Sequence, residues 1–140
     1  MTTLSNKPRG SSVRLRLVCG IAIFFLLACC LPCLDGGPAA PDSWDFEAGL
    51  IYGWVILLVG WEGGNNGVPW SANVFLFGGL FCLWKGWYRT ALCLGIVASV
   101  LGLTTWWVRR YDRLTIGYYV WQMSLLSLAL GSALARRKSK

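Results

Sequence analysis

The chain has 140 residues, of which 56% are hydrophobic and 14% are charged, and its net charge is +7. A soluble domain carries about a quarter charged residues, so this composition excludes an ordinary soluble globule, and the length allows one domain. The basic residues form short clusters between long uncharged runs, which is typical of membrane loops and not of a nucleic-acid-binding face. We therefore expect an all-α polytopic membrane protein that binds no nucleic acid.

The N-terminal third predicts a disordered segment followed by a first span. Residues 1–13 are expected to be disordered and cytoplasmic, and a single transmembrane domain is expected over residues 14–135. Residues 17–34 are uncharged and long enough to cross the bilayer, which takes about 17–25 residues. This run also resembles a signal peptide with a bacterial lipobox, which would make Cys29 a lipidated first residue. Because the apolar run continues beyond Cys29, we expect an uncleaved span.

A C-x-x-C sequence, Cys30 to Cys33, lies at the end of this first span. Two thiols at this spacing are typical of disulfide exchange, and the arrangement resembles the DsbB-type membrane thiol oxidases that pass electrons to quinone. That family needs a second cysteine pair in its other outer loop, whereas Cys82 and Cys93 lie near the predicted inner face. Redox chemistry at Cys30 and Cys33 is therefore kept as an alternative function only.

The next apolar stretch is interrupted by a Gly- and Asn-rich break at residues 63–69. Residues 48–61, before the break, are short for a span and are predicted to be a re-entrant or interfacial helix, whereas residues 69–84 are predicted to span. Asn73, near the start of that span, is expected to be buried and to bond free backbone groups of the re-entrant turn. Ligand binding is the alternative role for this amide.

Glu62 is the one acidic residue beside this part of the membrane core. We expect it to lie among lipid headgroups or to pair with Arg109 or Arg110. A cation site or a proton relay is the alternative.

Two further uncharged runs predict spans over residues 90–108 and 114–135, joined by a short loop and therefore antiparallel. Small residues allow helix backbones to approach closely in lipid, and both runs carry them four positions apart. These residues are Ala91, Gly95 and Ser99 in the first run and Ser127, Gly131 and Ala135 in the second. We predict a tight pair of these helices, and a similar close approach at Gly78 and Gly79. Glycines that line a permeation path are the alternative.

The distribution of basic residues predicts four spans rather than five. With four spans, the basic residues of the N-terminus, of residues 85–89 and of the tail at residues 136–140 share one side. Arg109, Arg110 and Arg113 lie on the other side, and five full spans would divide the basic residues almost evenly. The positive-inside rule then places both termini in the cytoplasm.

No motif for catalysis or cofactor binding is present. The chain has no His, which removes the commonest general base and metal ligand, and it contains no P-loop, GxGxxG motif or metal-ligand cluster. We therefore expect neither a metal nor a cofactor, and no enzyme.

Residues 46–135 carry a set of short motifs in a fixed order. They are Gly53-Trp54, Trp70-Ser71-Ala72-Asn73, Arg89-Thr90-Ala91-Leu92 and Gly117-Tyr118-Tyr119-Val120-Trp121. With these motifs the chain resembles a family of small uncharacterised bacterial inner-membrane proteins that share a WLANP-like motif, although Val74 stands where that family usually has Pro. The resemblance implies a four-helix protein of the bacterial inner membrane, and it implies no activity.

For function, we expect a non-catalytic accessory subunit or interaction partner of another membrane protein, or a homo-oligomer, within the lipid bilayer. The alternatives are an immunity protein against a membrane-acting toxin and the thiol oxidoreductase described above.

Overall fold

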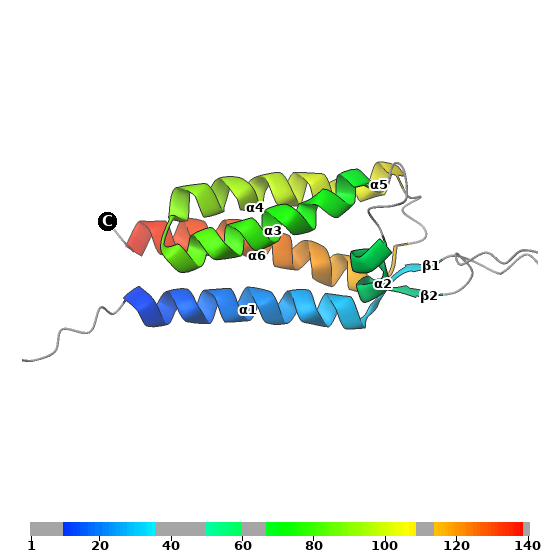
Figure 1. Cartoon of the computed structure of the whole chain (residues 1–140), viewed down its shortest axis with the longest axis horizontal. Coiled ribbons are helices and arrows are strands. Elements are labelled where there is room, and N and C mark those ends of the chain that lie inside the picture. Colours follow the sequence, from blue (N-terminus) through cyan, green and yellow to red (C-terminus); the bar gives the residue numbers. More distant parts are fainter. Residues whose placement is uncertain (1–9, 36–49, 60–66, 109–113, 139–140) are drawn as a thin grey trace, which may run out of the picture.

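The computed structural model describes residues 10–35, 50–59, 67–108 and 114–138, and the chain is mostly helical (Figure 1). The elements are α1 (Gly10–Cys30), β1 (Pro32–Asp35), β2 (Leu50–Tyr52), α2 (Gly53–Val59), α3 (Gly67–Lys85), α4 (Tyr88–Leu103), α5 (Thr105–Val108) and α6 (Ile116–Lys138). The expectation of an all-α fold class is thus confirmed.

The four long helices form a bundle in which α6 packs between α1 and α4, and α3 packs on α4. Figure 1 shows that α1 begins, α6 ends and the α3–α4 turn lies at one end of this bundle, whereas β1, β2, α2 and α5 lie at the other. The core between the helices combines small and branched apolar side chains: Ile21, Phe25, Ala72, Leu76, Leu83, Ala91, Ala98, Leu125 and Leu128. The described chain therefore passes along the bundle four times.

Local sequence explains where two of these helices end. Helix α1 stops at Cys30 because Pro32 follows, which lacks an N–H and disfavours helical backbone in the residue before it. Helix α3 ends at Lys85 and is followed by Gly86, whose φ of 83° lies in the left-handed region that glycine adopts without strain. The amide of Gly86 donates to the Leu83 carbonyl at 3.1 Å and that of Trp87 to the Cys82 carbonyl at 2.8 Å. This is the bonding of a Schellman cap.

Both outer limits of the predicted membrane domain need correction. The helix begins at Gly10, so residues 10–13 are helical rather than disordered, while residues 1–9 lie outside the described residues. At the other end, α6 continues to Lys138 and includes most of the expected tail. At the C-terminal end the basic residues extend the apolar helix, because Arg and Lys are good helix formers that end the apolar run without ending the helix.

The segment predicted as a re-entrant or interfacial helix over residues 48–61 is only partly helical. It contains β2, which pairs antiparallel with β1, and the seven-residue α2. A helix of that length rises only about 10 Å, so this segment does not span. The strands were missed because the pairing joins residues far apart in the sequence. Leu34 of β1 also bridges to Leu114 on its other side.

The helix predicted over residues 90–108 breaks at Thr104. The hydroxyl of Thr104 donates to the Leu101 carbonyl at 2.6 Å, and its amide donates to the same carbonyl at 3.1 Å. This i to i−3 bonding tightens the turn and separates α4 from α5.

By length and composition, two of the described helices can cross a membrane: Ser12–Cys30 and Gly67–Lys85. Helix α4 is apolar but has only 16 residues. The fold is therefore compatible with a membrane protein, and two helices rather than the expected four meet these criteria.

Candidate functional site

The strongest concentration of polar chemistry among the described residues is a seam of buried side chains between α3, α4 and α6. We call it the polar seam, and it consists of Asn73, Ser99, Tyr118, Trp121 and Gln122. Asn73, Ser99, Tyr118 and Gln122 are buried, and Trp121 is partly buried. Its hydrogen bonds connect all three helices.

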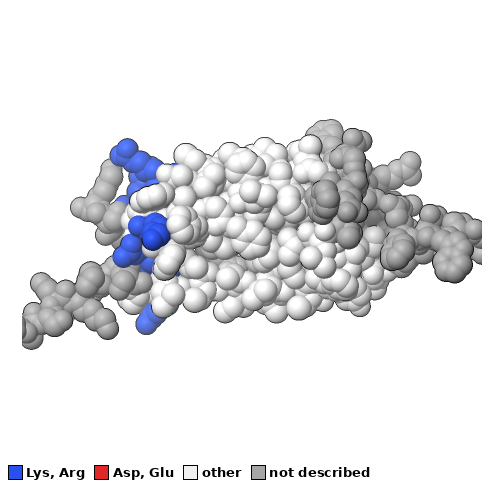
Figure 2. All heavy atoms as spheres, in the orientation of Figure 1, with Lys and Arg blue, Asp and Glu red and all other residues white. Residues whose placement is uncertain are grey.

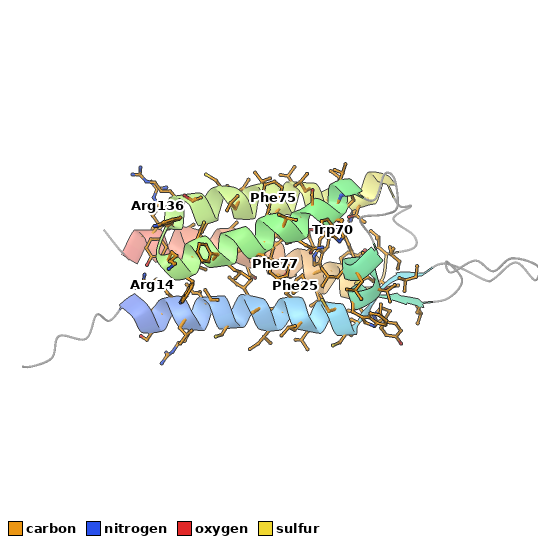
Figure 3. All side chains as sticks on the ribbon, in the orientation of Figure 1. Arg14, Phe25, Trp70, Phe75, Phe77 and Arg136 are labelled. Carbon is orange, nitrogen blue, oxygen red and sulfur yellow. The ribbon has the colours of Figure 1, made fainter. Side chains whose placement is uncertain are left out.

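Asn73 is buried as predicted, but its partner is a side chain of α6. The indole N–H of Trp121 donates to the Asn73 Oδ1 at 2.8 Å. Residues 60–66 of the expected turn lie outside the described residues. Trp70, labelled in Figure 3, donates its indole N–H to the Leu57 carbonyl of α2 at 3.0 Å. Trp70 thus joins α3 to α2, and Asn73 joins α3 to α6.

The α4 and α6 helices are joined by two further bonds of the polar seam. The Gln122 Nε2 donates to the Ser99 carbonyl at 3.0 Å, and the Tyr118 hydroxyl donates to the Gly102 carbonyl at 3.2 Å. Ser99 itself donates to the Gly95 carbonyl of its own helix at 2.8 Å. These three bonds are all accepted by backbone carbonyls of α4. The two that come from α6 therefore fix the position of α6 along α4.

Three buried oxygens in the described part of the chain have no hydrogen-bond partner: Thr105 Oγ1, Gln122 Oε1 and Ser132 Oγ. Gln122 is the functional candidate that the sequence analysis missed. The signal was available, because an amide within an uncharged run needs a partner inside the protein. The same rule identified Asn73.

Replacing Trp121 by Phe is expected to lower the free energy of unfolding by about 1–2 kcal/mol, because the Asn73 carbonyl oxygen is left buried without its donor. Thermal unfolding in detergent measures this loss. Asn73→Leu combined with Trp121→Phe should recover part of it, since both partners are then apolar. Additive losses in the double variant would contradict a direct bond.

The small residues predicted to pair the last two helices divide between two interfaces. Gly95 lies against Ala129 of α6, since a methyl group at Gly95 would come within 2.9 Å of the Ala129 Cα. Gly131 does not face α4: a methyl group there would approach only Leu17, at 3.5 Å, and Ile21, at 3.9 Å. The prediction for Gly131 is therefore wrong. Helix α6 packs on two neighbours, and residues two positions apart point to nearly opposite sides.

The other small residues occupy varied positions. Gly79 faces the side chain of Leu128. A methyl group in place of the Gly78 hydrogen would lie 3.7 Å from the Leu94 side chain. Ala91 and Ala135 are buried, while Ser127 is only partly buried. Gly79 thus contacts α6, whereas Gly78 faces α4.

The C-x-x-C pair is divided between two environments. Cys30 is exposed at the end of α1, whereas Cys33 is buried in β1, and all six cysteines are free thiols. The Cys33 Sγ lies 3.6 Å from the Ala28 carbonyl oxygen, to which it donates. Burial raises the pKa of Cys33 to about 12. Since the thiolate is the reactive form, this environment opposes thiol exchange at Cys33.

Alkylation should report this difference. In a variant that keeps Cys33 alone, the maleimide reaction is expected to accelerate about tenfold per pH unit from pH 7 to pH 10, because the neutral thiol persists below the raised pKa. Mass spectrometry measures the labelled fraction. A variant that keeps only the exposed Cys30 serves as the control and should react faster at pH 7. A plateau in the Cys33 rate below pH 10 would contradict the buried thiol.

The start of α6 holds β1 in place beside this thiol. The Thr115 amide donates to the Cys33 carbonyl at 3.1 Å, and the Thr115 hydroxyl donates to the Pro32 carbonyl. Gly117 allows the contact, because a methyl group there would lie 2.7 Å from the Cys33 Sγ. Gly53 plays the same part for α2 at the end of α1, where its methyl group would lie 2.9 Å from the Cys29 Cα.

Glu62, Arg109 and Arg110 lie outside the described residues. Within the described segments, no group of three or more Cys, Asp or Glu side chains is arranged to hold a metal ion.

Comparison with protein-family models, with curated proteins and with solved structures found no match for the chain. The resemblance to small bacterial inner-membrane proteins therefore stays a prediction. Two of its motifs do meet in the fold, since Asn73 of one bonds Trp121 of another.

Proposed function

We propose that the chain is a four-span protein of the bacterial inner membrane that acts without catalysis, as an accessory subunit or interaction partner of another membrane protein. In this proposal α1, α3, the α4–α5 pair and α6 each cross the bilayer. The single observation that carries it is the distribution of side chains on α4 and α6, which bury polar and small residues and expose large apolar ones.

Helix α6 buries polar residues beside Leu125 and Leu128, and it exposes a face of large apolar residues. Its buried polar residues are Gln122, Ser124 and Ser132. The exposed residues form a stripe along the opposite face: Tyr119, Met123, Leu126, Leu130 and Leu134. The inward polar side chains lower the mean hydropathy of α6, and the outward face is the part that lipid would contact. This pattern supports a spanning helix.

Helix α4 shows the same arrangement with small residues in place of polar ones. It buries Ala91, Gly95, Ala98, Ser99 and Gly102. It exposes Ile96, Val97, Val100 and Leu103. Small residues at the helix contacts and large ones outside are typical of membrane bundles. Together with α5, which follows after one residue, α4 is long enough to cross.

The ends of the bundle support the orientation. Figure 2 shows the described Lys and Arg side chains gathered at one end, with a long uncharged surface beyond them. Exposed aromatic residues accompany both ends: Trp84 and Trp87 near the basic end, and Tyr52, Trp54, Trp106 and Tyr119 near the other. Aromatic belts of this kind mark membrane interfaces, and the basic end is expected in the cytoplasm.

The non-catalytic part of the proposal is supported by how the polar groups are used. The hydrogen bonds of the polar seam run between helices or to helix backbones. The Cys33 thiol is buried and held protonated by its raised pKa. These groups build the bundle, which favours a function exercised through its surface.

Reporter fusions test the topology. A green fluorescent protein fused to either terminus should fluoresce, and alkaline phosphatase fused there should be inactive, because both termini are expected in the cytoplasm. The matched control inserts alkaline phosphatase after residue 40, between β1 and β2, where it should be active. Activity at one terminus only, or recovery of the chain in aqueous extract, would overturn the four-span proposal.

Isolation from native membranes tests the interaction. The tagged protein, extracted in mild detergent, should retain one membrane protein at fixed stoichiometry. A Gly95→Leu variant, expected to disrupt the bundle, should lose it and thereby controls for non-specific capture. Recovery of the chain by itself as a monomer would contradict the proposal, and a membrane-acting toxin as the partner would select the immunity function instead.

A further inference from the structure

The basic end of the bundle brings together cationic side chains from all four long helices. They are Arg14 and Arg16 of α1, Lys85 of α3, Arg89 of α4, and Arg136 and Arg137 of α6. Figure 2 shows no described acidic side chain in this region. This end of the bundle is therefore complementary to an anion. The positions of the cationic side chains indicate which kind of anion binds there.

Arg14 crosses from α1 to the turn between α3 and α4. A methyl group on Gly86 would lie 2.7 Å from the Arg14 Nη1 and 3.8 Å from its Cζ. The guanidinium thus lies against the backbone of the turn, and Figure 3 shows Arg14 and Arg136 at this same end. Arg14 is partly buried, whereas Arg16 is exposed. Two residues rotate a helix by about 200°, so Arg16 points away from the turn.

Lys85 adds a second cation beside the same turn. Its ammonium lies 5.0 Å from the ring centroid of Trp84 and 5.6 Å from that of Phe81, within cation–π distance. Both rings belong to exposed residues of α3, and Leu15 of α1 is exposed as well. Cationic groups and exposed apolar surface therefore adjoin each other at this end.

We infer that the Arg14 guanidinium and the Lys85 ammonium, at the α3–α4 turn, bind the phosphate of an anionic phospholipid of the cytoplasmic leaflet. A guanidinium matches phosphate oxygens in a two-point geometry. The adjoining apolar side chains of α1 and α3 accommodate the acyl chains, a contact that free phosphate and nucleic acid do not use. The inference rests on the proposed membrane placement, and it adds a ligand to the basic end.

Native mass spectrometry of the purified protein with phosphatidylglycerol and phosphatidylcholine tests this site. Wild type should retain phosphatidylglycerol in preference to phosphatidylcholine. Arg14→Gln should lower that retention about fivefold, the effect of one basic residue at a membrane surface. Arg16→Gln removes the same charge from the same helix on its other face, so it is the matched control and should change retention less than twofold. Arg14→Lys should fall between wild type and Arg14→Gln.

The outcomes separate this site from simpler explanations. Equal losses in Arg14→Gln and Arg16→Gln would show that net charge alone matters and would overturn the site. Displacement of the lipid by inorganic phosphate or by a short RNA at similar concentrations would also overturn it. Unchanged thermal unfolding of both variants in phosphatidylcholine shows that they fold. A protein that inserts into vesicles without preferring phosphatidylglycerol refutes this inference alone, whereas a protein that does not insert refutes the proposed function.

Discussion

Gly95→Ala is expected to force α4 away from α6 and to lower the free energy of unfolding by about 2 kcal/mol, within the range for overpacked cores. The added methyl group would lie 2.7 Å from the Ala129 backbone nitrogen and 2.9 Å from its Cα. Backbone atoms cannot rotate aside as a flexible side chain can, so the helices themselves must separate. Thermal unfolding in detergent, followed by tryptophan fluorescence, measures the loss.

Gly131→Ala is the matched control for this prediction. It makes the same exchange in α6, where the nearest atoms are side-chain carbons at 3.5 and 3.9 Å, which is ordinary van der Waals contact. We expect a change within about 0.5 kcal/mol. Equal losses in the two variants would mean that α6 does not direct Gly131 toward α1.

Gly117→Ala is expected to release β1 from the start of α6. The methyl group would lie 2.7 Å from the Cys33 Sγ and 2.9 Å from the Leu31 carbonyl oxygen. Because two sides of the position are occupied, the strand must move, and we expect a loss of about 2 kcal/mol. The same movement should expose Cys33, so its alkylation rate at pH 8 should rise together with the loss of stability.

Gly20→Ala provides the contrast for Gly117→Ala. No atom lies within 4 Å of a methyl group at Gly20 on α1, and Ala is the better helix former by up to about 1 kcal/mol. Stability should therefore stay constant or rise, with Cys33 still protected. An unchanged alkylation rate of Cys33 in Gly117→Ala would show that the position of β1 does not depend on its close contact with Gly117.

Hydropathy and small-residue spacing predicted the main features of the bundle well. The runs after residues 69, 90 and 114 correspond to α3, α4 and α6, and the close approach at Gly95 was expected from its neighbours Ala91 and Ser99. These features depend on local composition along one helix. They could be recognised because a membrane-like helix must present an uncharged run and small contact residues.

Features that depend on distant residues were not predictable in this way. The β1–β2 pairing joins Leu34 to Ile51, which are far apart in the sequence. Each strand has only three or four residues, too few to distinguish a strand from a helix by their pattern. The orientation of Gly131 depends on where α1 packs, which spacing along α6 cannot reveal. The predicted partner of Asn73 was wrong for the same reason, because its actual partner, Trp121, lies 48 residues away in the sequence.

The polar seam also has one feature that local sequence predicts and one that depends on distant residues. That an amide in a span needs a partner follows from the absence of water in the hydrocarbon core, so Asn73 was identifiable as buried. Which group serves it depends on the angle between α3 and α6. Gln122 satisfies the same rule and joins α6 to α4, so the rule locates such groups but cannot pair them.

The position of α6 between α1 and α4 has a consequence for biogenesis. Helix α1 leaves the ribosome first, yet its main neighbour among the helices is the last one made. Translation from Cys30 to Ile116 takes on the order of ten seconds at about 5–20 residues per second. During that interval α1 lacks its contact with α6, while α3 and α4 can already pack together as a hairpin. Premature termination before α6 would leave α1 without this neighbour and expose it to proteolysis.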